Sequence, residues 1–165
     1  MNIRKINIDD TENYLDMLKQ LDNETKYMMY EAGERKTSIE EMRLSIQNIV
    51  DTNKLLLVAE EEGKIIGFLS ANKGFANRIK HSAYIVIGIL KDYRGKKIGT
   101  RLFEELFQWA ASNKITRLEL TVMTNNENAI RLYKKMGFKV EGLKEKSLIV
   151  DGNYIDEYYM SKLLW

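Results

Sequence analysis

The sequence predicts an α/β domain in which helices pack on one mixed, largely antiparallel sheet of about seven strands. Two pairs of apolar runs flank the short turn signals at residues 61–64 and 151–152, which is typical of antiparallel hairpins. The run Tyr84–Leu90 is continuously apolar, which favours a strand at the centre of the sheet. Helical periodicity separates these strands, so the expected element order is β-α-α-β-β-β-α-β-α-β-β.

The N-terminal part predicts one strand and two helices. Asn2–Ile8 alternates apolar and polar residues, as a half-buried strand does. Asp9-Asp10-Thr11 then offers N-cap residues for a helix whose apolar face recurs at helical spacing. Ser38 and Glu41 have the spacing of a capping box and predict the start of the second helix. The apolar positions of the two helices are Tyr14, Leu15, Leu18 and Leu21, then Met42, Ile46, Ile49 and Val50.

The rest of the chain predicts two hairpins, two further strands and two further helices. A helix is expected from Ile98, and another from Asn126 to a left-handed stop at Gly137. Leu118, Leu120 and Val122 alternate with polar residues and predict the strand between these helices. The hairpins pair Lys54–Ala59 with Ile65–Ala71, and Phe138–Val150 with Tyr154–Leu163.

Composition limits the classes of function. The 165 residues fit a single domain, 1–165, and the net charge of +2 implies no general attraction to nucleic acid, so any anion site must be local. The chain has no cysteine and only one histidine, His81, so no thiolate or multi-histidine metal site is expected. The N-terminal residues lack the apolar core of a signal peptide, and no apolar run approaches the length of a membrane span. We expect a cytoplasmic protein.

A basic, glycine-bearing turn joins the central strand to the next helix. The segment "DYRGKKIGTRLFEEL" places Arg94, Lys96 and Lys97 beside a helix start, whose free N–H groups and dipole attract phosphate. Gly99 within the first turn costs about 1 kcal/mol of helix propensity relative to Ala, which a close approach to an anion would offset. A solvated basic turn is the alternative. Neither the Walker A pattern nor the dinucleotide-binding glycine pattern is present.

This turn resembles the pyrophosphate loop of the GNAT superfamily of acetyl-CoA-dependent N-acetyltransferases, whose signature is [Q/R]-x-x-G-x-[G/A]. Arg94 and Gly99 match the signature, whereas Lys97 replaces its first glycine. A second segment, "NNENAIRLYKKMGFKVEG", resembles the N-x-x-A-x-x-L-Y-x-x-x-G-F motif of the same superfamily without departure. The resemblance covers essentially the whole chain and implies a sheet in which the fourth and fifth strands splay apart.

The resemblance implies acetyl-CoA as cofactor and assigns residues to it. The backbone of Ile87, Gly88 and Ile89 would pair with the pantetheine arm, and Gly88 suits either a β-bulge or close packing. Asn126 would bind near the pantetheine or act as a plain N-cap. The Lys97 amide can still serve the loop if its φ is helical. The loop residues that would cradle the pyrophosphate are Arg94, Gly95, Lys96, Lys97, Ile98, Gly99 and Thr100.

Tyr133 occupies the position of the superfamily's usual general acid, which protonates the departing CoA thiolate. A tyrosine on the apolar face of a helix can also be a core residue. The base stays open, because the strand Tyr84–Leu90 contains no acid, and ribosomal-protein-type relatives carry a glutamate where Thr121 stands. Further candidates are Glu119, His81, Tyr84 and water.

Glu31 and Glu34 flank a glycine in the loop between the first two helices, which wall the acceptor site in this superfamily. Two carboxylates there would hold a cationic amine, although a solvated loop is the alternative. We expect transfer of acetyl to a small-molecule amine or polyamine. The alternatives are a protein N-terminal or lysine acetyltransferase acting on a peptide amine and a non-catalytic acyl-CoA sensor. No membrane or nucleic-acid partner is expected, and a homodimer stays open.

Overall fold

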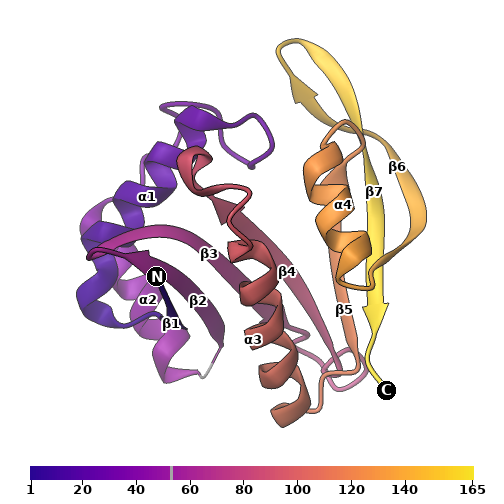
Figure 1. Cartoon of the computed structure of the whole chain (residues 1–165), viewed down its shortest axis with the longest axis horizontal. Helices are drawn as coiled ribbons and strands as arrows, with labels where there is room; N and C mark the ends of the chain where they lie inside the picture. The colour runs from indigo at the N-terminus through magenta and orange to yellow at the C-terminus, as the bar shows by residue number, and fades with distance from the viewer. Residues whose placement is uncertain (53) are drawn as a thin grey trace. The chain divides into compact units, whose positions relative to one another are not determined.

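The computed structural model describes residues 1–52 and 54–165. Seven strands form a sheet of order β1-β2-β3-β4-β5-β7-β6, in which β4 and β5 are parallel and the other pairs described are antiparallel. This confirms the expected mixed sheet (Figure 1). The strands are β1 (Asn2–Lys5), β2 (Leu55–Glu61), β3 (Lys64–Lys73), β4 (Ser82–Ile89), β5 (Arg117–Met123), β6 (Lys139–Val150) and β7 (Asn153–Leu163). The helices are α1 (Thr11–Glu24), α2 (Ile39–Asp51), α3 (Ile98–Ser112) and α4 (Glu127–Lys135), with two 3-10 turns, η1 (Ile8–Asp10) and η2 (Lys91–Tyr93).

The contacts divide the chain into two compact units. Unit 1 comprises Met1–Asn72 and Val86–Leu106, and unit 2 comprises Lys73–Ile85 and Phe107–Trp165. Each unit is discontinuous in sequence, because β3, β4 and α3 each begin in one unit and end in the other. That the chain folds as one domain remains a prediction.

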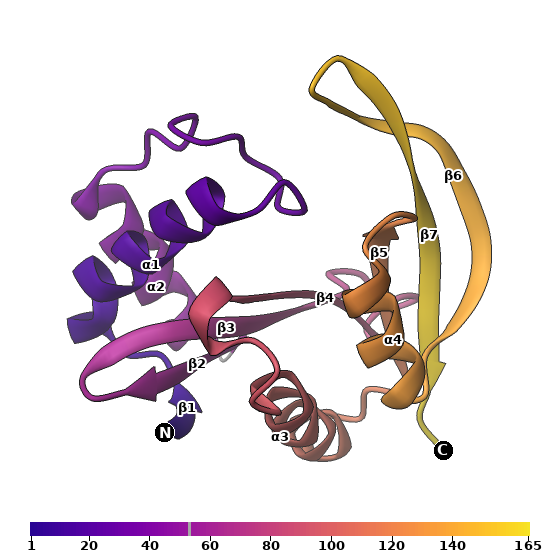
Figure 2. The same ribbon diagram turned by 45° about the horizontal axis from the view of Figure 1, so that its top comes forward.

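Unit 1 contains β1, β2 and most of β3, with α1 and α2 lying together beside them (Figure 2). The turn between β2 and β3 is Glu62-Gly63, with φ of 51° and 77°, the left-handed pair that tight hairpins require. The predicted capping box starts α2, because Ser38 Oγ accepts from the Glu41 amide at 3.1 Å and Glu41 Oε2 accepts from the Ser38 amide at 2.9 Å. Buried side chains here include Leu15, Met17, Leu21, Ile46, Ile65, Ile66 and Leu69.

The first strand is shorter than predicted, because a capped 3-10 turn replaces its second half. Asn7 Oδ1 accepts from the Asp9 amide at 3.0 Å, and Asp10 Oδ2 accepts from the Asn7 amide at 2.9 Å. Both Asp10 oxygens also accept from the Arg4 guanidinium, at 2.7 and 2.8 Å. The chain therefore turns at Asn7, and α1 follows directly on η1.

Unit 2 contains β5, β6 and β7 with α4 alongside (Figure 2). Residues Ser82–Tyr84 of β4 pair in parallel with Arg117–Glu119 of β5 at the beginning of both strands. The turn between β6 and β7 is Asp151-Gly152, with φ of 51° and 78°, as the hairpin signal predicted. Buried side chains include Ala83, Ile85, Trp109, Leu118, Leu120, Phe138 and Met160.

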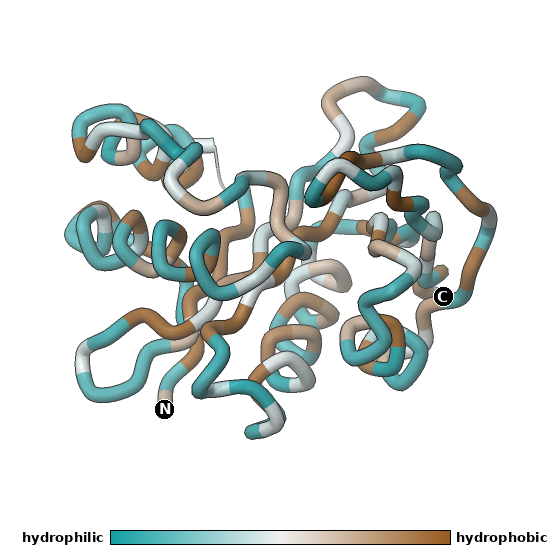
Figure 3. Tube along the Cα trace, turned by 90° about the horizontal axis from the view of Figure 1, so that it is seen from above, coloured by the Kyte–Doolittle hydropathy of each residue, from teal (hydrophilic) through white to brown (hydrophobic). Residues whose placement is uncertain are grey.

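Helix α4 ends as its sequence predicts. Gly137 has φ +92°, its amide donates to the Lys134 carbonyl at 3.0 Å, and the Phe138 amide donates to the Tyr133 carbonyl at 2.9 Å. These two bonds form a Schellman motif. Along the trace, hydrophobic and hydrophilic residues alternate through the helices, as expected for amphipathic segments (Figure 3).

Candidate active site

Gly88, near the end of β4 in unit 1, is closely packed against its neighbours. A Cβ added at Gly88 would lie 2.5 Å from Leu21 Cδ2 and 2.9 Å from Phe68 Cε1. Leu21 and Phe68 are themselves buried, so neither side chain has space to withdraw. Close packing therefore explains this glycine. The neighbouring Ile87 and Ile89 are half-buried.

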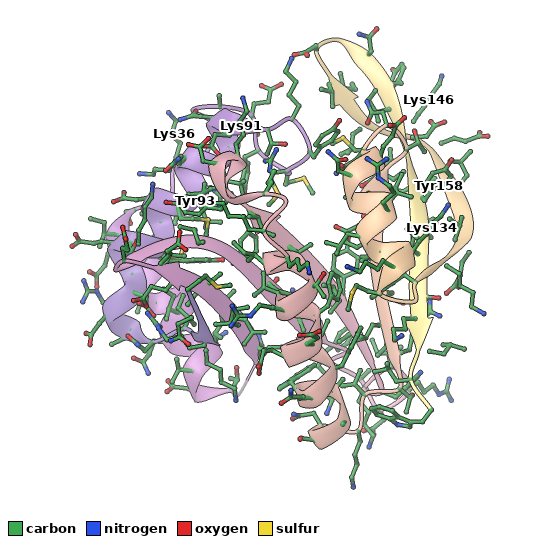
Figure 4. The ribbon with its side chains drawn as sticks, viewed as in Figure 1. Lys36, Lys91, Tyr93, Lys134, Lys146 and Tyr158 are labelled. Atoms are coloured by element: carbon green, nitrogen blue, oxygen red, sulfur yellow. The ribbon has the colours of Figure 1, made fainter. Side chains whose placement is uncertain are left out.

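The turn between β4 and α3 contains two residues in the left-handed region. Figure 4 labels Lys91 and Tyr93, which begin this turn. Gly95 has φ +74° and Lys97 has φ +62°. The φ of Lys97 is therefore not helical: the lysine adopts the conformation that favours glycine, the residue usual at this position of the motif.

The start of α3 offers backbone donors to an anion. The Arg101 amide donates to the Lys97 carbonyl at 3.1 Å, as the first i to i−4 bond of this helix. The amides of Ile98, Gly99 and Thr100 precede it, so helical geometry provides them with no acceptor. The positive end of the helix dipole lies at the same place. Gly99 is buried, as expected for a residue at a closely approached helix start.

The cations of the loop are exposed, and two of them have partners. Arg94 Nε donates to the Ile89 carbonyl at 3.1 Å, and Lys96 Nζ lies 5.1 Å from the centre of the Tyr93 ring. Exposed side chains with such weak partners can reorient toward a phosphate at little cost. The loop thus combines exposed positive charge with free backbone donors.

The beginning of this loop is tied to the end of α1, which the sequence analysis did not anticipate. The Lys91 amide donates to Glu24 Oε2 at 2.8 Å, and Gln20 Nε2 donates to Glu24 Oε1 at 2.6 Å. Residues 24 and 91 are far apart in sequence and follow no motif. No local sequence pattern predicts a contact between these two residues.

Glu31 and Glu34 lie in one exposed turn around Gly33, whose φ is +78°. Glu34 Oε2 accepts from the Glu31 amide at 2.8 Å, so this carboxylate stabilises the turn. This contact favours a structural role for Glu34.

A buried ion pair anchors the loop that carries this turn. Arg35 Nε donates to Asp22 Oδ2 at 2.7 Å, and the Asp22 side chain is 2% exposed. The Arg35 guanidinium also lies 4.7 Å from the centre of the Tyr30 ring. Asp22 stands one position after Leu21 on the apolar face of α1. A charged residue there was the sequence signal that could have revealed the pair.

Asn126 and Tyr133 belong to unit 2. Asn126 Oδ1 accepts from the Ala129 amide at 3.3 Å and caps α4, so the plain N-cap role is present. Tyr133 is 8% exposed and its ring centre lies 6.1 Å from that of Phe138. Burial raises the pKa of Tyr133, and the nearby Tyr84 raises it further. The phenol is therefore protonated near neutral pH, as a general acid must be.

The candidate bases have different surroundings. Tyr84 Oη and Thr121 Oγ1 are 2.7 Å apart, a hydrogen bond that the sequence analysis missed. Arg117 donates to Glu119 at 2.8 Å and also contacts Glu141 at 2.7 Å, so Glu119 is held in an ion-pair network. The carbonyl of His81 accepts from the amides of Thr116 and Arg117 at 2.9 and 3.2 Å, and its side chain is exposed.

Two properties of the described residues bear on other classes of site. Residues 1–52 and 54–165 contain no group of three or more His, Asp or Glu side chains placed to hold a metal ion. Across the same residues, each helix is too short or too polar to cross a lipid bilayer.

Residues 15–138 match the sequence model of the acetyltransferase (GNAT) family. An L-amino acid N-acetyltransferase of Escherichia coli K12 is 32% identical over 108 residues, which are 65% of this chain and 67% of that protein. The spermidine N(1)-acetyltransferase of the same strain is 29% identical over 137 residues, which are 82% of this chain and 73% of that protein.

Solved structures show the same fold. A GNAT-family acetyltransferase from Streptococcus pneumoniae superposes with a TM-score of 0.94 at 31% identity, covering 99% of both chains. A phosphinothricin acetyltransferase from Sinorhizobium meliloti, solved in complex with acetyl-CoA, has a TM-score of 0.85 at 23% identity, covering 99% of this chain and 88% of that one. The chain belongs to the GNAT family of acetyltransferases, whose acyl donor is acetyl-CoA.

Proposed function

We propose that the protein transfers the acetyl group of acetyl-CoA to the primary amine of a small molecule, an amino acid or a polyamine. The observation that carries the proposal is the start of α3, where free amides follow the left-handed Gly95 and Lys97 among exposed cations. Such a helix start suits a pyrophosphate. The relatives named for L-amino acids and spermidine support a small acceptor.

The proposal gives roles to residues of β4 and of the two motifs. In unit 1 the backbone of Ile87, Gly88 and Ile89 binds the pantetheine arm and polarises the thioester carbonyl. The loop Arg94–Thr100, with its side chains and amides, binds the pyrophosphate. In unit 2, Asn126 binds the cofactor in addition to capping α4, and Tyr133 is the general acid.

The reaction is a direct transfer. The amine nitrogen attacks the thioester carbonyl carbon, and a tetrahedral intermediate forms. The C–S bond then breaks, the sulfur takes a proton from Tyr133, and the nitrogen loses one proton. An ammonium acceptor first releases one proton to solvent, so the nitrogen that attacks is neutral. From that point the nitrogen loses one proton and the sulfur gains one, so the reaction needs a proton path between these two groups.

The acceptor ammonium binds near the loop between α1 and α2. Glu31 is exposed there, and Glu34 stabilises the turn that presents it. The ion pair of Asp22 with Arg35 holds the loop in place. One carboxylate presented on an anchored loop suits a small cationic acceptor.

The experiment is turnover with acetyl-CoA, in which a dye detects the free thiol of CoA. Amino acids, polyamines and peptides with free N-termini are compared at equal concentrations. The proposal expects higher kcat/KM with a small amine than with any peptide. Preference for a peptide would instead identify a protein acetyltransferase. Binding of acetyl-CoA without turnover on any amine would identify a sensor.

Two further sequence predictions belong with this proposal: a single domain and a cytoplasmic location. A homodimer stays open. Coincident unfolding of both units in calorimetry and circular dichroism would support the single domain. Sedimentation of the purified protein would measure its oligomeric state.

A further inference from the structure

The hydroxyls of Tyr84 and Thr121 meet across two parallel strands of unit 2. Their oxygens are 2.7 Å apart, and either can be the donor. Tyr84 is 38% exposed and Thr121 is half-buried, so the pair reaches the surface. Tyr84 also precedes Ile87, the first proposed pantetheine-binding residue, by three positions on β4.

The proposed reaction requires a proton path that the carboxylates near this pair do not provide. Strand β4 carries no acid along Ser82–Ile89. Glu119, the acid of β5, accepts a hydrogen bond from Arg117 at 2.8 Å and is held in this ion pair. A general base formed by a free carboxylate is therefore missing from these two strands as described. The side chains on these two strands that remain available for proton transfer carry hydroxyl groups.

We propose that Thr121 and Tyr84 form a hydroxyl relay that carries the proton of the attacking amine to Tyr133. The relay rests on the proposed function. Thr121 Oγ1 accepts the proton of the amine as the C–N bond forms, and it passes its own proton to Tyr84 Oη. Tyr84 passes its proton to Tyr133, which protonates the sulfur as the C–S bond breaks. Each hydroxyl ends with one proton, so the step balances without a carboxylate.

The electrostatics of the phenols support the last link of the relay. The pKa of Tyr133 is raised first by burial and then by Tyr84, so the two phenols are close enough to interact. A buried phenol that resists ionisation needs its proton replaced as it gives one up. A neighbouring hydroxyl meets this need.

An ordinary cross-strand hydrogen bond is the competing explanation. Such a bond contributes about 1 kcal/mol to stability and nothing specific to kcat. Tyr84→Phe and Thr121→Val remove one hydroxyl each with little change of shape. Thr121→Ser keeps the hydroxyl and loses only a methyl group. Tyr154→Phe makes the same change as Tyr84→Phe beside the β6–β7 turn and is the matched control.

The test measures kcat, the KM for acetyl-CoA and the melting temperature of each variant with the best small amine. The relay expects kcat to fall at least ~10-fold in Tyr84→Phe and in Thr121→Val, while the KM for acetyl-CoA stays within about twofold. The double variant should be no slower than the slower single variant, because the path is already broken. Thr121→Ser should keep most of the wild-type kcat.

Three outcomes would overturn the relay, and they are distinguishable. If the wild type turns over while Tyr84→Phe and Thr121→Val match Tyr154→Phe in kcat, the relay is wrong and the proposed function stands. If the wild type binds acetyl-CoA but acetylates no amine, both fail together. A fall in kcat that Thr121→Ser shares fully, with an equally lowered melting temperature, would identify a structural bond and also refute the relay.

Discussion

Gly88 and Leu21 are packed so closely that a Cβ on Gly88 would lie 2.5 Å from Leu21 Cδ2. We expect Gly88→Ala to destabilise the fold by ~1–3 kcal/mol, the usual cost of overpacking a filled core. At roughly 3 °C per kcal/mol for a chain of this length, thermal unfolding should reveal the change clearly.

Gly142→Ala is the matched control for this substitution. A Cβ at Gly142 would have Tyr159 Cδ2 at 3.9 Å, an ordinary van der Waals contact. Its melting temperature should equal that of the wild type or rise slightly, because alanine loses less conformational freedom on folding. Equal melting temperatures for the Gly88 and Gly142 variants would contradict the packing explanation.

Lys97 is a lysine in a conformation that glycine adopts more easily. We expect Lys97→Gly to leave the free energy of unfolding unchanged or raise it by up to ~1 kcal/mol, because the strain of φ +62° is relieved. Its affinity for acetyl-CoA should nevertheless fall and lose part of its salt dependence, because one exposed cation is removed. Urea unfolding and calorimetric titration at two salt concentrations measure the two effects separately.

Lys97→Asn separates charge from backbone, because asparagine tolerates the left-handed region but carries no charge. It should weaken acetyl-CoA binding to the same extent as Lys97→Gly. Tighter binding in either variant would show that the lysine charge does not contact the cofactor.

The features that the sequence predicts correctly depend on residues close together in the chain, whereas the features it does not predict depend on residues far apart. Glu62-Gly63 and Asp151-Gly152 form turns through their own φ preferences, and Ser38 reaches Glu41 within one helical turn. Gly137 ends α4 for the same local reason. Each of these features is encoded within a few residues, so the pattern predicted it correctly.

The features that the sequence did not predict are hydrogen bonds between residues distant in the chain and one backbone conformation that its own residue does not favour. Tyr84 and Thr121 are separated by 37 positions, and Glu24 and Lys91 by 67. Lys97 has a φ of 62°, in the left-handed region that lysine does not favour by itself. Composition and periodicity contain no information on such contacts.

Gly99→Asp tests the assignment of the α3 start to the pyrophosphate. Acetyl-CoA that binds only the folded state stabilises it by RT ln(1 + [L]/Kd), or ~2.7 kcal/mol at a hundredfold excess over Kd. An aspartate there adds a charge and bulk against the phosphates and should abolish this gain. Gly99→Ala is the control for folding. Equal thermal shifts in wild type and Gly99→Asp would exclude the loop as the cofactor site.

Asp10 should make stability depend on pH in the acid range. The hydrogen bonds from Arg4 lower the pKa of Asp10 below its ordinary value of 3.8, against the opposing effect of burial. A lowered pKa in the folded state gives stability that is present above about 3.8 and is lost as the pH falls through the folded value.

Asp10→Asn should cost ~1–3 kcal/mol at pH 7, because it removes charge-assisted hydrogen bonds to Arg4. The variant and the wild type should approach each other in stability as the pH falls toward 3. Urea unfolding at pH 7, 5 and 3 measures this convergence. A constant difference across the series would show that the ionised carboxylate is not what stabilises the fold.

Tyr133→Phe separates catalysis from packing, and Tyr14→Phe is its matched control. Tyr14 and Tyr133 are similarly buried, at 7% and 8% exposure, and burial raises the pKa of both. Removing either hydroxyl keeps the ring and should lower stability by about 1 kcal/mol. Tyr133 alone is proposed to protonate the CoA sulfur.

Loss of a positioned general acid typically lowers the rate 10²–10⁴-fold, so we expect turnover of Tyr133→Phe to fall at least ~10-fold. Its affinity for acetyl-CoA should remain, and Tyr14→Phe should keep the wild-type turnover. The loss should shrink with acyl donors whose thiols are more acidic, because such thiolates leave without a proton. If Tyr133→Phe turns over like Tyr14→Phe and both melt early, Tyr133 is a packing residue and water must protonate the thiolate.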